Sequence, residues 1–185
     1  MLLRSFVSID IEGPLIRSNV ERIQRELSLT HADLKFVDPG ILHVTLLFLG
    51  DVEESLTREM CGLLRGEELM AKRIVLGGLG FFPSATRPRV VWLGMTSGAE
   101  ELSIAADKVT ALLKPFGFAP DSKDFQSHIT IARVKSGRNR DKLVERAHEL
   151  SKEPIGEVTT SPVRLKKSTL TPKGPIYDTI CEAKP

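Results

Sequence analysis

The sequence predicts an α+β fold, in which two duplicated β-α-β-α-β units form a bilobal structure with antiparallel sheets facing a central cleft. Segments with alternating apolar residues, typical of strands, take turns with segments whose apolar residues have helical spacing. The order of these segments repeats with an offset of 85 residues. The 41% hydrophobic and 27% charged residues are ordinary for a soluble globular chain, and a length of 185 residues suits one domain.

The first unit contains three strands and two helices. Pro14 suits the first turn of a helix, and the apolar residues that follow it have helical spacing. Glycine and proline mark the ends of the other segments. The expected elements are strands at 4–11, 42–49 and 73–79, helices at 14–28 and 53–65, and a loop at 81–88.

The second unit repeats this order. Pro115 and Gly117 follow its first helix, and a turn is expected at 171–175. The expected elements are strands at 89–95, 127–134, 156–170 and 175–181, and helices at 99–113 and 139–151.

We expect a single bilobal domain over residues 1–185. Repeat unit one covers about 3–81, repeat unit two covers about 88–170, and a C-terminal strand follows at 175–181. Copies of a duplicated unit commonly pack around a pseudo-twofold axis, so equivalent strands should meet at the shared cleft.

Charge is distributed unevenly along the chain. The net charge of +2 is too small to indicate nucleic-acid binding by itself. Residues 1–120 carry 13 basic and 15 acidic groups, whereas residues 121–185 carry 13 and 9. A basic rim would attract a polyanion, and a solvated surface is the simpler interpretation. The basic residues cluster at Arg133, Lys135, Arg138, Arg140 and Lys142, and at Arg164, Lys166, Lys167 and Lys173.

The two cysteines, Cys61 and Cys181, have no motif spacing. We therefore expect reduced thiols and a cytoplasmic protein, without a disulfide framework. The N-terminus enters a strand pattern at once, so we expect no signal peptide, and no apolar run approaches the ~18 residues of a membrane span. No apolar stripe stands out as an interface, and we expect a monomer.

A four-residue motif occurs once in each unit, as His43-Val44-Thr45-Leu46 and as His128-Ile129-Thr130-Ile131. Because side chains alternate along a strand, each His shares a face with its Thr. One such motif alone would indicate a histidine in a core or on a surface. Two copies at matching places in a repeat indicate a functional pair, whereas His31 and His148 do not repeat and are expected on the surface.

Two imidazoles and two hydroxyls around one tetrahedral centre suit phosphate chemistry. Hydroxyls donate hydrogen bonds to phosphate oxygens. Imidazoles titrate near neutral pH, so one can take a proton from water while the other gives a proton to the leaving oxygen. The sequence shows no cluster of ligands for zinc and no P-loop, so we expect neither a metal nor a cofactor.

At these residues the chain resembles the 2H phosphoesterase superfamily, and within it the RNA 2′,3′-cyclic phosphodiesterase and 2′-5′ RNA ligase branch. The resemblance covers nearly the whole chain. Besides the two motifs, it rests on the segments at 6–9, 47–50, 87–94, 132–133 and 168–177.

The resemblance implies hydrolysis of an RNA 2′,3′-cyclic phosphate end to a 2′-phosphate without a metal. His43 would be the general acid toward the 3′ oxygen and His128 the base, although the two roles could be exchanged. Thr45, Thr130 and Arg133 would bind the phosphate. Arg133 has the opposite strand parity from His128, so it reaches the same face only if the strand twists, bulges or ends first.

Several alternatives remain at this point. The same site would serve a reversible 2′-5′ RNA ligase acting on tRNA halves, a phosphodiesterase for a smaller cyclic ester, or a module that binds RNA ends without catalysis. The partner implied is RNA with a cyclic phosphate end, such as a tRNA fragment. Phe48, Phe81 and Phe82 would stack a base or, more simply, pack in the core. Core packing is also expected for Trp92, and Arg87 and Arg89 suit solvent or phosphate equally.

Overall fold

The computed structural model describes residues 1–69, 73–120, 125–172 and 174–184. Its elements, in chain order, are β1 (Leu2–Asp10), α1 (Pro14–Ser28), β2 (Leu34–Phe36), η1 (Pro39–Ile41), β3 (His43–Glu53), α2 (Glu54–Leu64), β4 (Arg73–Phe82), β5 (Val90–Ser97), α3 (Ala99–Leu113), η2 (Lys114–Phe116), β6 (Ile129–Val134), α4 (Arg140–Leu150), β7 (Gly156–Thr159), β8 (Val163–Thr171) and β9 (Gly174–Glu182).

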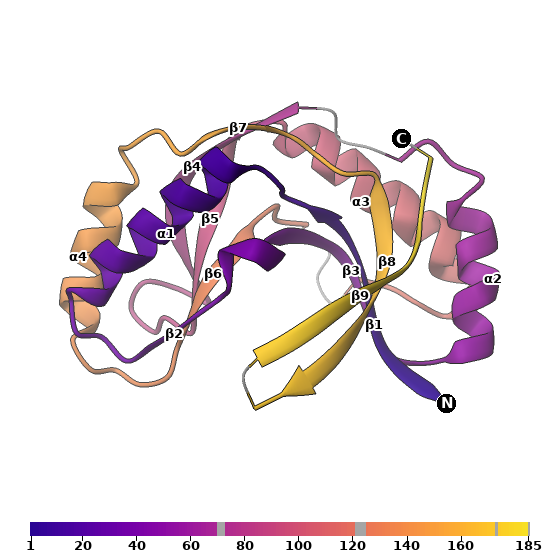
Figure 1. Ribbon diagram of the computed structural model, residues 1–185, viewed down its shortest axis with the longest axis horizontal. Coiled ribbons are helices and arrows are strands. Elements are labelled where there is room, and N and C mark those ends of the chain that lie inside the picture. The colour runs from indigo at the N-terminus through magenta and orange to yellow at the C-terminus, as the bar shows by residue number, and fades with distance from the viewer. Residues whose placement is uncertain (70–72, 121–124, 173, 185) are drawn as a thin grey trace.

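The strands form one curled antiparallel sheet in the order β7-β4-β5-β6-β3-β1-β8-β9, and β2 pairs with β6 (Figure 1). This order is palindromic under the 85-residue offset, because β5 is equivalent to β1, β6 to β3 and β8 to β4. The symmetry supports the expected duplication. Each half of the sheet also contains a strand from the other half of the sequence, since β4 lies beside β5 and β8 lies beside β1.

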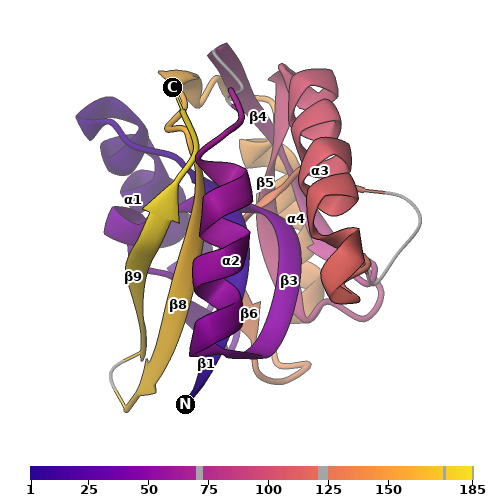
Figure 2. The same cartoon turned by 90° about the vertical axis from the view of Figure 1, so that its right-hand side faces the viewer.

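Four helices cover the outer face of the curled sheet in two pairs (Figures 1 and 2). α1 packs on α4 near β6 and β7, and α2 packs on α3 near β3. The side chains buried between the helices and the sheet are aliphatic and form a continuous core, which includes Ile9, Ile23, Val44, Leu102, Ile129 and Leu143. The two helix pairs leave the inner face of the sheet uncovered (Figures 1 and 2).

The α+β fold class expected from the sequence is confirmed. The helices at 14–28 and 99–113 have the predicted bounds, since Pro14 and Gly98 mark their starts. The short strand β2 was not predicted, because three residues without clear alternation carry no strand signal. β4 continues to Phe82, which shortens the loop expected at 81–88. Lys173, in the predicted turn, lies outside the described residues.

The prediction of reduced cysteines is wrong. Cys61 in α2 and Cys181 in β9 form a disulfide, with their Cα atoms 5.9 Å apart. They are 120 residues apart in sequence, and only the packing of α2 against β9 brings them together. Cysteine spacing therefore gave no sign of the bond, and it no longer supports a reducing compartment. Within the described residues, no helix is both long and apolar enough to cross a membrane.

Candidate functional site

The two predicted motifs meet at the centre of the sheet, where β3 pairs with β6. The pairing joins Val44 to Ile129, which are equivalent residues of the two units, so the pseudo-twofold axis passes between them. Antiparallel pairing then sets His43 beside Thr130 and Thr45 beside His128, at about 4.5–5.5 Å between Cβ atoms. All four side chains are partly exposed, whereas Val44 and Ile129 are fully buried against the helices.

Both imidazoles are oriented by the same hydrogen bond. His43 Nδ1 lies 2.9 Å from the carbonyl oxygen of Ile41, and His128 Nδ1 lies 2.8 Å from that of Gln126. A carbonyl oxygen only accepts hydrogen bonds, so Nδ1 must be the protonated nitrogen in each ring. Nε2 is thereby left as the nitrogen that gains or loses a proton.

Each imidazole packs against two aromatic rings. The ring of His43 lies 5.1 Å from the rings of Phe6 and Tyr177. The ring of His128 lies 4.8 Å from Phe82 and 6.3 Å from Trp92. The indole of Trp92 fits here because the neighbouring strand has Gly80, where an added Cβ atom would overlap the indole.

A buried group of charges lies next to His43. Asp10, opposite His43 in β1, accepts hydrogen bonds of 2.8 Å from Lys166 Nζ at both carboxylate oxygens and one of 2.6 Å from Arg164. Burial lowers the pKa of His43 below its usual value, and the cation of Lys166 lowers that pKa further. The hydrogen bond to Ile41 and the charge of Asp10 act in the opposite direction.

Arg133 lies on the same face as His128 because β6 contains a bulge. The register of β5 and β6 shifts between Val91 and Trp92, and Ile131 and Ala132 are both buried. The shift reverses the parity of the strand, so the exposed Arg133 follows Thr130 on the inner face. β3 has a matching irregularity, which places Phe48, the equivalent of Arg133, on this face with 44% of its surface exposed.

Some of the other predicted residues lie where the sequence analysis expects them, and others do not. His31 and His148 are exposed, as predicted. Core packing was the wrong expectation for Phe48, Phe82 and Trp92, because strand irregularities and the His128 contacts bring them to the inner face.

Sequence reasoning missed three neighbours of His43, namely Phe6, Tyr177 and Asp10. Of these, Phe6 and Asp10 share the alternating face of the first strand, which was the available signal. Lys166, expected at a surface, is buried in its ion pair with Asp10, with only 8% of its side chain exposed.

The polar groups around the motifs suit proton transfer and anion binding. They are two imidazoles, two hydroxyls and one guanidinium. Across the described ranges, no three His, Cys, Asp or Glu side chains lie close enough together to hold a metal ion.

Comparison with known proteins identifies the family. The LigT like Phosphoesterase model matches the chain twice, over residues 13–92 and 93–177. This chain belongs to the LigT-like phosphoesterase family. The resemblance to the 2H phosphoesterases is thereby confirmed, and the double match agrees with an internal repeat.

Relatives of this LigT-like phosphoesterase cover nearly its whole length. It is 41% identical over 181 residues to the RNA 2′,3′-cyclic phosphodiesterase of Methanothermobacter thermautotrophicus, covering 96% of each chain. It is 40% identical to the protein of the same name from Aeropyrum pernix, covering 88% of this chain and 93% of that one.

Solved structures share the fold. E. coli LigT in its apo form matches with a TM-score of 0.76 at 21% identity, covering 100% of this chain and 99% of LigT. A crystal structure of a Thermus thermophilus protein gives a TM-score of 0.73 at 25% identity, covering 97% of this chain and 95% of that one.

Proposed function

We propose that this LigT-like phosphoesterase hydrolyses the terminal 2′,3′-cyclic phosphate of RNA to a 2′-phosphate, without a metal, using His43 and His128 as acid and base. The observation that carries the proposal is the pairing of Val44 with Ile129, which sets each histidine beside the threonine of the other motif. The curated relatives named as RNA 2′,3′-cyclic phosphodiesterases support the substrate class.

The proposed reaction needs one proton taken and one proton given. Nε2 of His128 takes a proton from water, and the hydroxide attacks phosphorus. The bond from phosphorus to the 3′ oxygen breaks, and Nε2 of His43 gives its proton to that oxygen. Thr45 and Thr130 donate to the non-bridging oxygens, and Arg133 offsets their negative charge. The products are a 2′-phosphate and a 3′-hydroxyl.

The protonation of His43 depends on the substrate in this scheme. Burial lowers its pKa, which favours the neutral imidazole in the free protein. A bound phosphodiester anion favours the charged imidazolium, so substrate binding would protonate His43. His43 would later donate that proton to the leaving oxygen. If the anion has no such effect, the neutral His43 suits the base, and the roles of the two histidines are exchanged.

The direct test uses RNA ending in a 2′,3′-cyclic phosphate, with EDTA present, and identifies the product end. We expect a 2′-phosphate from the wild type. His43→Ala and His128→Ala should each lower turnover by roughly 10²–10⁴-fold. His31→Ala and His148→Ala, which remove exposed histidines away from the motifs, serve as controls and should keep full activity.

The outcomes separate the competing functions. Loss of activity with EDTA would contradict a metal-independent reaction. If the wild-type protein leaves the cyclic end intact, two functions remain. They are hydrolysis of a smaller cyclic ester and binding of RNA ends without catalysis. A 2′-5′ ligase would instead join the cyclic end to an added 5′-hydroxyl RNA, which lengthens the strand.

A further inference from the structure

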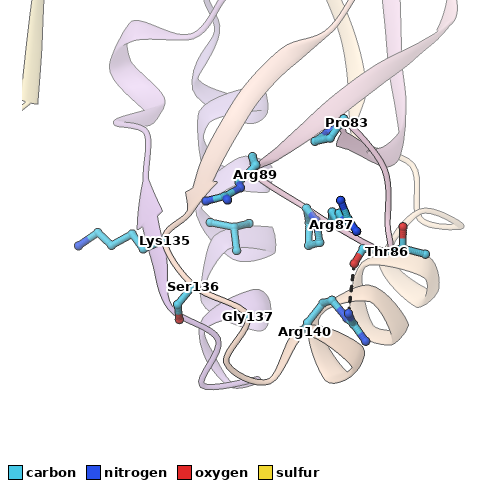
Figure 3. Close-up of a pocket in the computed structure, with 10 residues that line it drawn as sticks. Pro83, Thr86, Arg87, Arg89, Lys135, Ser136, Gly137 and Arg140 are labelled. Atoms are coloured by element: carbon cyan, nitrogen blue, oxygen red, sulfur yellow. Dashed lines mark hydrogen bonds between the residues drawn. The ribbon is translucent and has the colours of Figure 1, made fainter.

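A basic pocket lies beyond the end of β6, outside the site described above. Its volume is about 520 Å³. One wall is the loop between β4 and β5, with Arg87 and Arg89, and the other is the segment 134–137 (Figure 3). Arg140, at the start of α4, closes one end, and none of the described residues that line the pocket is acidic.

Arg140 holds the loop and α4 together at the pocket. Its positive charge is partly neutralised, so it is less available to a ligand. Its Nη1 donates to the carbonyl oxygen of Thr86 at 3.1 Å, which ties α4 to the loop (Figure 3). Its Nε and Nη2 donate to Asp141 Oδ1 at 2.9 and 2.8 Å, so that carboxylate offsets its charge.

Arg87 and Arg89 are different, because their backbones are hydrogen-bonded and their guanidinium groups have no salt-bridge partner among the described residues. Arg87 N donates to Ser84 O at 3.3 Å. Arg89 N donates to Phe82 O at 2.7 Å, and Arg89 O accepts from Val134 N at 2.9 Å. Over the part of the chain that the structure describes, neither guanidinium lies within 4.0 Å of a carboxylate oxygen.

Arg87 and Arg89 both line the space between the loop and the 134–137 segment, while Lys135 points away from it in Figure 3. A pair of unneutralised guanidinium groups on a fixed backbone matches the oxygens of a phosphate, which guanidinium binds in a bidentate manner. The chemistry of the pocket therefore fits a phosphate group.

The pocket is too far from the motifs to hold the reacting phosphate. Lys135, on its wall, follows Thr130 by five residues of extended chain, which is about 17 Å at ~3.3 Å per residue. It nevertheless begins at Val134, directly after Arg133. Val134 packs into the core on the face opposite to Arg133, so an RNA strand whose end lies at the histidines would reach the pocket by passing Arg133 and turning around the end of β6.

We propose that this pocket binds a backbone phosphate of the RNA strand, upstream of the cyclic end. The proposal rests on the proposed function for the RNA substrate, but its own residues are Arg87 and Arg89. It predicts that the protein prefers a polynucleotide to a single nucleotide, because only a longer strand reaches both sites.

The first experiment compares an oligoribonucleotide ending in a 2′,3′-cyclic phosphate with a 2′,3′-cyclic mononucleotide. In the double variant Arg87→Gln/Arg89→Gln, we expect KM for the oligoribonucleotide to rise about tenfold or more. The kcat on both substrates and KM for the mononucleotide should stay unchanged. Arg25→Gln/Arg65→Gln removes the same charge from exposed arginines on α1 and after α2, and should change neither KM.

The second experiment measures binding without turnover, using single-stranded RNA with an ordinary 3′-hydroxyl. The double variant should bind more weakly, and the slope of log K against log salt should fall by about 1.4, since each contact to a single-strand phosphate contributes about 0.7. This measurement tests phosphate binding by the pocket even if the wild type hydrolyses neither substrate. The absence of hydrolysis would refute the proposed function instead.

Three results would overturn the proposal. The first is an unchanged KM and an unchanged salt slope in the Arg87→Gln/Arg89→Gln variant. The second is an equal loss on the mononucleotide, which would assign the arginines to the reacting phosphate. The third is weaker binding of inorganic phosphate with unaltered RNA binding, which would make the pocket a site for free phosphate.

Discussion

The two equivalent His-x-Thr motifs have different surroundings in this protein. His43 has Phe6, Tyr177 and the charges of Asp10 and Lys166 around it, whereas His128 has Phe82 and Trp92. A general acid and a general base need different protonation states at one pH. Under the proposed function, the different neighbours would favour different protonation states for the two imidazoles, which identical surroundings could not do.

The pKa of His43 provides a prediction at the residue scale. In the free protein, its imidazole should titrate below the usual value of about 6.5, because burial and Lys166 disfavour the cation. Removing the cation with Lys166→Met should raise this pKa, and Lys166→Arg should leave it low. The measurement is an NMR titration of the imidazole, repeated with inorganic phosphate, which should also raise the pKa.

The same shift has a consequence for stability. The unfolded chain binds the proton of His43 at a higher pH than the folded protein does. The contribution of His43 to stability is therefore present above about pH 6.5 and is lost as the pH falls toward the lower folded pKa. A stability that rises on acidification through this window in the wild type, relative to His43→Ala, would contradict the lowered pKa.

Residue-level prediction from the sequence succeeds where side chains simply alternate. His43, Thr45, His128 and Thr130 fall on one face, as period two requires. Arg133 does not follow from alternation, because its face depends on a bulge in the pairing of β5 with β6. Register between strands is set by tertiary contacts, and a single sequence does not contain them explicitly.

At the scale of elements, β4 and β5 support the second histidine through a close approach. Gly80 pairs with Trp92, whose indole occupies the space of a Cβ atom, and Trp92 in turn lies beside Phe82 and His128. A glycine within a strand often marks such an approach. Three of the four residues at 77–80 are glycine, which is such a signal in the sequence, but the residue that approaches Gly80 could be found only from the structure.

Gly80→Ala should therefore displace Trp92. The added methyl group overpacks the contact, which typically costs about 1–3 kcal/mol of stability, and it disturbs the ring next to His128. We expect lower turnover and a changed fluorescence of Trp92, the only tryptophan of the chain. Denaturant unfolding and fluorescence spectra measure both effects.

A glycine with free space is the matched control for this change. Gly62→Ala in α2 meets no atom within 4 Å and should raise stability by about 0.5–1 kcal/mol without altering turnover. A second change tests the cause, because Trp92→Leu in the Gly80→Ala background should recover stability. Wild-type stability and fluorescence in Gly80→Ala alone would refute the close contact as a constraint.

At the scale of the whole molecule, the duplication extends to the order of the strands. The fold class and the helix bounds follow from the spacing of apolar residues along the chain. That spacing lies within each repeat unit, so the sequence alone shows it. The exchange of β4 and β8 between the halves of the sheet was not predictable, because it depends on which strand edges remain free after the units pair. The disulfide depends on the same long-range arrangement.

The disulfide leads to the last prediction. It closes a loop of 120 residues and ties α2 to the edge strand β9, so it restricts the unfolded chain strongly. Removing it with Cys61→Ala/Cys181→Ala, or with a reductant, should lower the free energy of unfolding by about 2–4 kcal/mol. Both cysteines are buried between α2 and β9, and the single variants should match the double variant, because either one alone breaks the bond.

Turnover at moderate temperature should survive this change, since the bond lies on the side of α2 and away from the motifs. Tyr177 lies in the same strand as Cys181, but its contact with His43 is on the inner face. Thiol titration of the unfolded wild type, with and without reductant, tests the bond directly. Two free thiols before reduction, or equal stabilities of the reduced and oxidised forms, would show that β9 is held by packing and strand pairing alone.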